Sequence, residues 1–480
     1  MASVLTPDLC VIGAGASGLA VAEAARRLGA SVTVVEKASF GGASLRSGSL
    51  ALQALAASAR RTALAITSPA FGVYPEEAPK VSFRKVHDHI AEVIARTAPQ
   101  VSEARFAALG VDIVKGVAAF ADPRTVKVGD SEIRARRFVL ATGARPLLPD
   151  IPGLLSVPYF TQDTIFDNTR KLTHLVVLGA GPMAVELALS YNRLGCEVSI
   201  VETGRILPQI DPELAEIALR RLRDEGVKLY ENAATVAVQA RAQGIGVVIR
   251  TTGEDTLTLD ASHILVATGS AANLEELQLD AARIRRSKSD PGALSLNQSL
   301  RTTNQRVYAV GEVAGHAPAP HLNALEADLV VRAALLNQPS RYDPAAVPRL
   351  ILTDPAIAEI GLSEAVARAR FKSGFEVLRA GFAENDRARA ERNGMGMVKL
   401  IVARSGTILG AGIVGPGAAE LAAIFATAIA LKLHASRLIE VTAPHPSYAD
   451  IVRSLGEQAF AGSAQARALA RRLRFSRLLP

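Results

Sequence analysis

Two copies of one local pattern constrain the fold of this chain more than any other feature of its sequence. Residues 8–37 run from an apolar strand through a glycine-rich turn into an alanine-rich helix and then a second strand. Residues 171–202 repeat the plan, and in both copies an acidic residue stands 23 positions after the first glycine. A unit of this kind is typical of the nucleotide-binding half of a doubly wound sheet. The sequence therefore predicts an α/β fold with two Rossmann-like dinucleotide-binding domains.

The first glycine-rich turn has the spacing of a dinucleotide-binding fingerprint, with Gly13, Gly15 and Gly18 followed by Glu36. In such a motif the first glycine makes the tight turn, and the second lets the backbone approach a pyrophosphate. The third allows close helix packing, and the helix N-terminus supplies N–H groups to the phosphates. Because the motif stands between a strand and a helix, with Glu36 placed for a ribose hydroxyl, it predicts a dinucleotide site.

The second copy differs at one glycine, since Gly179 and Gly181 are followed by Ala184 at the third position. Glu202 would place a negative charge beside a 2′-phosphate, which favours NAD(H) over NADP(H). Arg205 lies close enough in sequence to leave NADP(H) open.

Further repeats and a change of pattern indicate the domain organisation. Apolar strands end in Ala-Thr-Gly at residues 138–143 and 264–269, and a third ends in Gly-Glu at 311–312. From about residue 345, separated strands and a long helix predict an α+β domain. The predicted domains are an FAD-binding domain at 1–155 and 275–344, an NAD(P)H-binding domain at 156–274, a dimerisation domain at 345–460 and a basic tail at 461–480.

Composition limits the protein class. With 480 residues, 49% hydrophobic and 21% charged, the chain is long enough for two or three domains of an ordinary globular protein. The apolar runs are strand-sized and no basic leader precedes the first strand, so we expect no transmembrane helix and a cytoplasmic location. The two cysteines, Cys10 and Cys196, stand in or beside strand patterns, where they are expected to be buried fillers.

The last twenty residues carry five of the eight net positive charges, with no acidic residue among them: Arg467, Arg471, Arg472, Arg474 and Arg477. Residues 467–479 could form a basic amphipathic helix with Leu469 and Leu473, and Phe475 or Leu479, on its apolar side. Such a helix can lie on anionic lipid. A solvated helix or one packed on a dimer is the alternative, and nucleic-acid binding has no motif support.

Together these motifs resemble the pyridine nucleotide–disulfide oxidoreductase family, which includes dihydrolipoamide dehydrogenase, glutathione reductase and mercuric reductase. Phrases at 353–355, 361–363 and 382–392 are most similar to the mercuric-reductase branch. The resemblance covers nearly the whole chain except the tail. It implies FAD on the first unit, NAD(P)H on the second and a homodimer formed by the C-terminal domain.

The resemblance also implies the site residues. Those for FAD are Gly13, Gly15, Ala16, Ser17, Gly18, Glu36, Lys37, Gly42, Ala43, Ser44, Ala141, Thr142, Gly143, Gly311 and Glu312. Those for NAD(H) are Gly179, Gly181, Pro182, Met183, Glu202, Ala267, Thr268 and Gly269. Glu312 departs from the family's usual Asp by one methylene, which alters the expected geometry at the ribityl chain.

The chain departs from the family most strongly at the redox centre. Where the family carries Cys-x4-Cys and a Lys, this sequence has Ser44, Ser49 and Gln53. A serine hydroxyl cannot form or attack a disulfide, because that chemistry requires thiolates. Mercuric ion, lipoamide and glutathione disulfide are therefore excluded as substrates by their chemistry. Electrons would leave directly from the flavin.

Three residues are implied as catalytic. Glu186 matches an acid near the nicotinamide, and since its usual Lys partner is Gln53 here, a carboxylate–amide contact is expected. Gln53 would also remove a positive charge beside the flavin. His445 and Asp450 resemble the family's His-Pro-Thr-x-x-Glu pair. His445 either donates a proton to the acceptor or only packs beside the flavin of the other subunit. No metal site is expected.

The predicted function is an FAD-dependent NAD(P)H oxidoreductase that passes electrons to a diffusible acceptor. A quinone, another small oxidant, dioxygen or a second pyridine nucleotide would suit. The alternative is a catalytically decayed flavin- or nucleotide-binding protein that acts by association. A weaker alternative is an external thiol protein that exchanges electrons at the vacant pocket.

Overall fold

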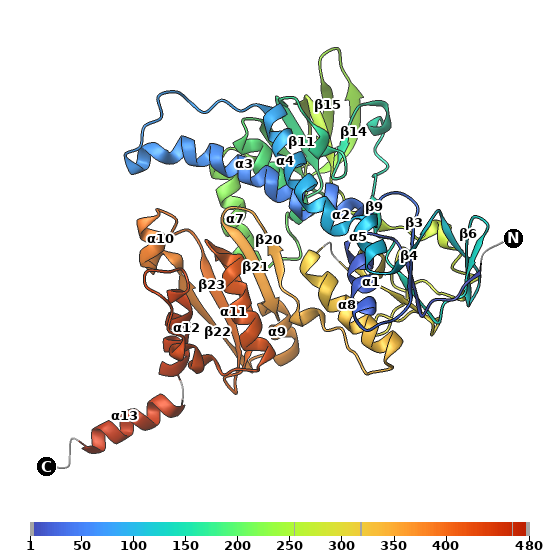
Figure 1. Cartoon of the computed structure of the whole chain (residues 1–480). Helices are drawn as coiled ribbons and strands as arrows, with labels where there is room; N and C mark the ends of the chain where they lie inside the picture. Colours follow the sequence, from blue (N-terminus) through green and yellow to red (C-terminus); the bar gives the residue numbers. More distant parts are fainter. Residues whose placement is uncertain (1–3, 254, 317–318, 463, 477–480) are drawn as a thin grey trace. The chain divides into compact units, whose positions relative to one another are not determined.

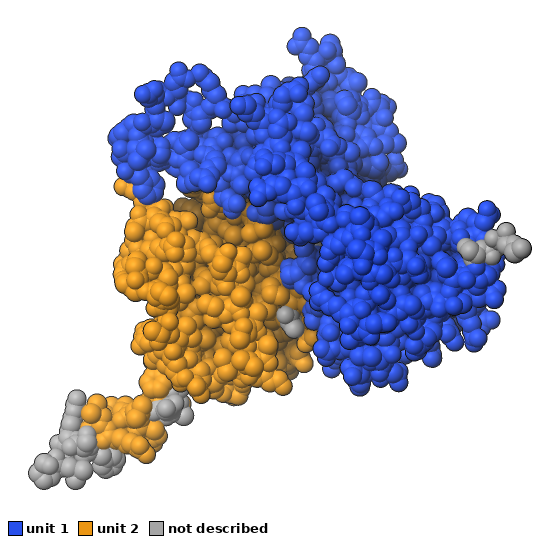
Figure 2. Space-filling view, viewed as in Figure 1, with its two compact units in different colours: residues 1–203, 230–342 blue, residues 204–229, 343–480 orange. Residues whose placement is uncertain are grey.

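The computed structural model describes residues 4–253, 255–316, 319–462 and 464–476 and has the α/β fold that the sequence predicts (Figure 1). The chain divides into two compact units (Figure 2). Unit 1 contains residues 1–203 and 230–342, and unit 2 contains residues 204–229 and 343–480. Residues 204–229, which follow the second fingerprint in sequence, therefore belong to the same compact unit as the C-terminal part.

The first sheet of unit 1 is built around the first fingerprint. Its strands pair in parallel in the order β19-β8-β2-β3-β4. Their bounds are β2 (Leu9–Ile12), β3 (Val32–Glu36), β4 (Val111–Lys115), β8 (Arg137–Leu140) and β19 (Val307–Ala309). All four residues of β2 are buried, as expected for a parallel strand with both faces covered. The strand order reverses beside β2, which is where sheets of this type bind ligands.

Two helices flank this strand. α1 (Ala16–Arg27) follows the glycine-rich turn directly and packs against α8 (Pro320–Leu335). Leu9 and Val11 face these helices in one core, whereas Cys10 and Ile12 face a second core on the opposite side of the sheet.

The second fingerprint builds a matching sheet in the order β10-β17-β11-β12-β13. Its bounds are β10 (Phe160–Thr161), β11 (His174–Leu178), β12 (Glu197–Val201), β13 (Lys228–Tyr230) and β17 (His263–Val266). α6 (Pro182–Arg193) follows β11 and has its Pro in the first turn, where the missing N–H costs nothing. α3 (Ser49–Thr67) packs against α6 and against α4 (Phe83–Thr97).

Short elements complete unit 1. An antiparallel sheet contains β14 (Ala234–Ala240), β15 (Ile245–Arg250) and β16 (Thr256–Ala261). A four-stranded sheet has the order β1-β7-β6-β5, with bounds Val4–Leu5, Ser131–Ile133, Thr125–Val128 and Ala118–Asp122. β9 (Ala144–Pro146) pairs with β18 (Ser270–Ala272), and α2 (Gly42–Arg46) and α5 (Glu103–Ala108) are short helices.

Unit 2 is an antiparallel five-stranded sheet covered by helices. Its order is β20-β21-β24-β23-β22. The bounds are β20 (Arg349–Ile351), β21 (Ala356–Gly361), β22 (Phe375–Gly381), β23 (Met397–Ala403) and β24 (Ile408–Gly415). Side chains from α11 (Ala418–Ala430) and α12 (Asp450–Ala461) join the main core on one face of this sheet. The short helices α9 (Glu364–Phe371) and α10 (Asp386–Ala390) complete the unit.

α7 (Pro212–Asp224) packs on strands β21 and β24. Gly412 of β24 leaves the room this requires, because a Cβ there would lie 2.5 Å from Leu214 Cδ1. Residues 212–224 are thus packed directly on the unit 2 sheet.

A row of charged residues crosses the sheet beside α7. Arg349, Glu359, Gly412, Lys399 and Arg379 are successive register partners on the five strands. Residues directly opposite one another across a sheet project to the same face, so this row presents its charges on one side.

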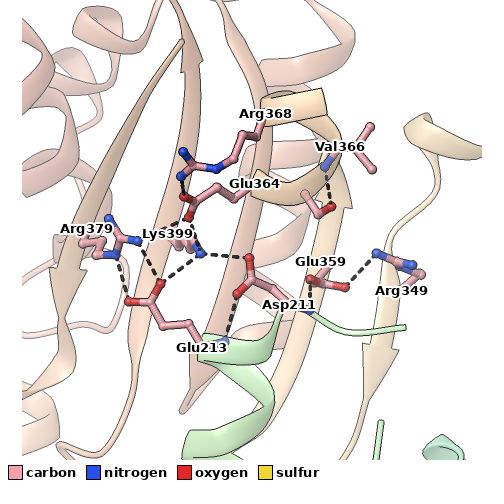
Figure 3. A network of polar contacts seen from close by, with 10 residues as sticks. Asp211, Glu213, Arg349, Glu359, Glu364, Val366, Arg368, Arg379 and Lys399 are labelled. Carbon is pink, nitrogen blue, oxygen red and sulfur yellow. Dashed lines mark hydrogen bonds and ion pairs between the residues drawn. The ribbon is translucent and has the colours of Figure 1, made fainter. Parts of the chain in front are cut away.

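Figure 3 shows the network that these charges form, which we call the Lys399 network. Lys399 is only 4% exposed, and its Nζ pairs with Asp211 Oδ2 at 2.8 Å, Glu213 Oε2 at 2.9 Å and Glu364 Oε2 at 2.7 Å. Arg379 binds Glu213 through two hydrogen bonds of 2.8 and 2.9 Å. Four cations face four carboxylates in the whole network: Arg349, Arg368, Arg379 and Lys399, with Asp211, Glu213, Glu359 and Glu364.

Acid is expected to weaken unit 2 through Glu213. Hydrogen bonds from Arg379, and then Lys399, lower the pKa of Glu213 from 4.5 to about 2. Because the folded value is the lower one, Glu213 adds stability above about pH 4.5 that is lost as the pH falls toward 2. The denaturant midpoint should drop across this window, and Glu213→Gln should reduce the drop. Glu216→Gln, an exposed change on the same helix, is the control; equal pH profiles for all three proteins would refute the assignment.

The basic tail contains a helix, α13 (Ala464–Ser476). Arg477 and Leu479 of the predicted amphipathic segment, and the side chain of Phe475, lie outside the described part of the chain. Among the residues that the structure describes, no helix combines the length and apolar character needed to cross a membrane.

Candidate active site

Two positions of the first glycine-rich turn, Gly13 and Gly15, have different surroundings and backbone angles. Gly13 has φ +108°, and a Cβ there would lie 2.3 Å from the carbonyl oxygen of Ala141. Gly15 has φ −74° and ψ 176°, which any residue adopts, and no atom lies within 4 Å of where its Cβ would be. The protein's own backbone thus requires Gly13, whereas Gly15 faces open space.

Both glycines line a cavity of about 310 Å³ in unit 1. The structure brings these predicted FAD residues together around it: Gly13, Gly15, Ala16, Ser17, Glu36, Lys37, Gly42, Ala43, Ser44, Ala141, Thr142, Gly143, Gly311 and Glu312. Gly18 does not line the cavity, because it packs on the turn; a Cβ there would lie 2.1 Å from Gly13 O. Met183, predicted for the nicotinamide nucleotide, lines the same cavity.

The carboxylate of Glu36 is fixed at the end of β3 by backbone donors. Ala14 N–H donates to Oε2 at 2.6 Å and Ala38 N–H donates to Oε1 at 2.7 Å. The neighbouring Lys37 forms an ion pair with Glu276. These contacts hold an acidic group beside the turn, at the position expected for a ribose ligand.

α8 supplies two polar residues that sequence reasoning missed. Ser17 Oγ donates to Asn323 Oδ1 at 2.7 Å, and the N–H of Gly311 donates to Glu326 Oε2 at 2.6 Å. Glu326 is fully buried and its other oxygen lies 2.5 Å from His316 Nδ1. The spacing of Asn323 and Glu326 could have indicated them, since residues three apart on a helix share a face.

Residues 44–49, where the family resemblance implies a cysteine motif, form a serine-rich part of the cavity wall. Ser44, Ser47 and Ser49 all line the cavity, and Ser47 Oγ donates to Asp163 Oδ1 at 2.9 Å. Burial, and then the charge of Asp163, raise the pKa of Glu312 above its usual value. Asp163 is a further residue that the sequence did not single out.

The two cysteines of the chain are free and buried. Burial raises the pKa of the Cys10 thiol, and it raises the pKa of Cys196 to about 11. A thiol protonated at neutral pH is a poor nucleophile. Their burial agrees with the expectation that both are structural.

The second glycine-rich turn repeats the geometry of the first. Gly179 has φ +96°, and a Cβ there would lie 2.4 Å from Ala267 O. This repeats the close approach of Gly13 to Ala141 O. Gly181 has φ −70° and ψ 174° and, like Gly15, has no atom within 4 Å of its Cβ position. Ala184 at the third position is buried and continues α6 without interruption.

The other residues predicted for this nucleotide lie on the same unit. Pro182 begins α6, Glu202 follows β12, and Thr268 Oγ1 donates to Leu147 O at 2.8 Å. Ala267 and Gly269 follow β17 directly. The structure therefore places these segments at the carboxyl ends of neighbouring parallel strands.

One expected contact is absent. Glu186 is buried on α6, and α3, which carries Gln53, packs against that helix. The buried Nε2 of Gln53 nevertheless has no hydrogen-bond partner, so the expected amide-to-carboxylate hydrogen bond is not formed. The glutamine side chain has fewer rotatable bonds and a shorter reach than lysine, and the N–H donors of Gln53 Nε2 have no acceptor here.

His445 and Asp450 lie together in unit 2, as the family resemblance implies. His445 Nδ1 lies 3.2 Å from Asp450 Oδ2, which also accepts the N–H of Ser447 at 3.1 Å. The other ring nitrogen, Nε2, lies 3.8 Å from Asp386 Oδ2. The imidazole is 66% exposed, so it is oriented by carboxylates yet open to a reactant.

Comparison with known proteins decides the family. Residues 7–327 match the family described as pyridine nucleotide-disulphide oxidoreductase, and residues 347–455 match its dimerisation domain. The chain belongs to this family. It is therefore an oxidoreductase of the flavoprotein class, and the family resemblance found in the sequence is confirmed.

Similar curated proteins include a dihydrolipoyl dehydrogenase of Geobacillus stearothermophilus, 32% identical with 94% of this chain and 96% of the relative covered. A mercuric reductase of Staphylococcus aureus is 28% identical, with 92% and 80% covered. Among solved structures, LpdA of Mycobacterium tuberculosis has a TM-score of 0.84 at 23% identity, covering 95% of this chain and 99% of that one. The likeness to LpdA concerns the fold.

The cavity fits FAD, the cofactor of the family. A Cβ at Gly15 or Gly143 would enter open space, so the backbone there can be approached closely. The N-terminus of α1 and the fixed carboxylate of Glu36 supply the groups that a pyrophosphate and a ribose require.

Proposed function

We propose that this protein is an FAD-dependent NAD(P)H oxidoreductase that passes electrons from NADH to a diffusible acceptor without a redox-active disulfide. The observation that carries the proposal is the thiol-free cavity wall of Ser44, Ser47 and Ser49, together with the burial of both cysteines elsewhere. No thiolate is available to relay electrons at this wall. The acceptor must then be reduced at the flavin itself.

The residues proposed to hold FAD are those of the cavity, with the pyrophosphate at the N-terminus of α1 and the ribose at Glu36. FAD, when bound, supplies a hydride acceptor that can pass its electrons onward. Gly179, Gly181, Pro182, Met183, Ala267, Thr268 and Gly269 are proposed to hold the nicotinamide nucleotide. Glu202 would repel a 2′-phosphate, which supports NADH over NADPH.

The acid–base roles are proposed for His445, Asp450 and Glu186. Asp450 would hold the His445 ring through Nδ1, leaving Nε2 to give a proton to the reduced acceptor. Glu186, buried on α6 after the second turn, would help to place the nicotinamide.

The proposed partners follow from the same reasoning. The dimerisation domain supports a homodimer. A quinone is the proposed acceptor class, because its reduction needs two electrons and two protons and no thiol. We propose a cytoplasmic protein whose basic tail contacts the inner face of the membrane. The proposed domains remain 1–155 with 275–344 for FAD, 156–274 for NAD(P)H, 345–460 for dimerisation and 461–480 as the tail.

A second candidate is a flavin- or nucleotide-binding protein that has lost catalysis. The residues Ser44, Ser49 and Gln53, at the positions where the family resemblance implies two cysteines and a lysine, favour it together with Glu312. An amide cannot supply the positive charge that would stabilise a reduced, anionic flavin.

Anaerobic mixing of the FAD-loaded protein with NADH and, separately, NADPH tests the proposal. We expect NADH to bleach the flavin absorbance and to bind about tenfold more tightly than NADPH, a difference of ~1.4 kcal/mol. Adding a water-soluble quinone should then restore the absorbance. No long-wavelength thiolate band should accompany the reduction.

The double variant Ser44→Cys/Ser49→Cys is the matched control, because a thiolate band should appear only when that pair is introduced. Absence of bleaching with either nucleotide would refute the proposed activity and leave the binding protein as the better account. Bleaching without reoxidation by any quinone would refute the acceptor class alone.

A further inference from the structure

The last helix of the chain has a one-sided composition. α13 contains Arg467, Arg471, Arg472 and Arg474, all exposed, and no acidic residue. Leu469 and Leu473 are also exposed, by 48% and 54%. The last acidic residue before the C-terminus is Glu457, so nothing within the tail neutralises these arginines.

Helical geometry separates the two kinds of side chain. At about 100° per residue, Arg467, Arg471 and Arg474 fall within about 60° of one another. Leu469 and Leu473, four residues apart, occupy the opposite side, and Ala466 and Ala470 lie between these leucines and Arg474. Arg472 and Arg474 border this apolar side at its two edges.

We propose that α13 binds an anionic lipid surface, lying in the plane of the interface. The two leucines would enter the acyl boundary, while the bordering arginines extend their guanidinium groups to lipid phosphates. This inference deepens the membrane contact in the proposed function and rests on it. Charge complementarity argues for lipid, because four cations without an acid match a surface of negative headgroups.

The dimerisation domain strengthens the argument. Two leucines and four arginines give one tail only modest affinity. A homodimer carries two tails, and the second tail then binds at a high effective concentration once the first has bound. The family match for dimerisation ends at residue 455, so the tail lies beyond the matched region.

Co-sedimentation of the full-length, FAD-loaded protein with vesicles tests the proposal, in the absence of nucleotide. We expect binding to vesicles of phosphatidylcholine and phosphatidylglycerol at 7:3, but not to phosphatidylcholine alone, and loss of binding at high salt. Arg471→Gln/Arg474→Gln should weaken the binding of each tail about 25-fold, since each arginine contributes about fivefold. Leu469→Ser/Leu473→Ser should weaken it about 100-fold or more, since each leucine would bury several CH2 groups.

Arg437→Gln/Arg453→Gln is the control, since it removes two exposed cations elsewhere in unit 2 and should bind as the parent does. An equal loss of vesicle binding in this control would overturn the proposal, because binding would then depend on the overall positive charge of the protein and not on α13. Equal binding to neutral vesicles, or unchanged binding by both tail variants, would also overturn it. A tail variant that changes the particle mass in ultracentrifugation would make α13 a subunit contact. Quinone reduction assayed without lipid reports separately on the proposed activity.

Discussion

Substituting valine for Gly15 is expected to reduce FAD binding by about 100-fold or more, or ~2.7 kcal/mol, while leaving the apoprotein folded. Gly15 has an extended backbone that valine adopts, and no atom lies within 4 Å of its Cβ position. The new side chain would therefore fill the open space in which a pyrophosphate approaches the turn. The FAD content per chain, from the absorbance ratio of the purified protein, measures the loss.

The stability of this variant must be compared with that of the parent apoprotein, because bound FAD itself stabilises the folded state. Gly13→Val provides the contrast. Its side chain would meet Ala141 O at 2.3 Å and needs φ +108°, so it should lower the unfolding free energy even without FAD. Full FAD retention by Gly15→Val would contradict the placement of the cofactor.

Gly181→Val is the matched control for the site assignment. Gly181 shares the backbone angles and the open surroundings of Gly15. This variant should keep its FAD but bind NADH about 100-fold more weakly. Loss of FAD from both variants would mean that the two turns do not serve separate nucleotides.

The Lys399→Met change is expected to cost about 3–5 kcal/mol in unfolding free energy, because it removes the cation that pairs with the buried Asp211 carboxylate. The ammonium of Lys399 pairs with three carboxylates at 2.7–2.9 Å and is almost fully buried. Denaturant titration of the FAD-loaded protein should show the loss. Amide exchange should become faster in β21, β23 and α7, the elements that the Lys399 network joins.

An exposed lysine of the same unit, Lys432, is the control, and Lys432→Met should change stability little. Adding Glu364→Gln to Lys399→Met should make the double variant about 1–3 kcal/mol more stable than the sum of the two losses, since it removes a carboxylate that has lost its pairing with Lys399. Strict additivity of the two changes would show that the network is not coupled.

Much of the nucleotide-binding architecture was predictable because its determinants are local. In the C-terminal part, the long helix expected after residue 345 is α11, and the separated strands expected there are β20 to β24. A run of alternating or continuous apolar residues ended by glycine restricts the backbone within a few residues. The family was predictable for the same reason, since its motifs are short and contiguous.

The expected Gln53–Glu186 hydrogen bond shows where sequence reasoning failed. The expectation placed the Gln53 amide where the family resemblance implies a lysine and assumed the same contact with Glu186. Whether an amide reaches a carboxylate depends on how α3 packs against α6, and this packing leaves Gln53 Nε2 unsatisfied.

The sequence by itself determined the α/β class, the two fingerprint turns, the serines at positions 44 and 49 and the basic tail. Only the tertiary structure decided the Lys399 network and the attachment of residues 204–229 to unit 2. It also decided the contacts of Ser17 with Asn323, 306 residues away, and of Ser47 with Asp163, 116 residues away. The physical reason is range, because a turn is set by the dihedral angles of adjacent residues. A row of charged residues across paired strands, or a buried ion pair, forms only after strands and helices that are distant in the sequence have packed together.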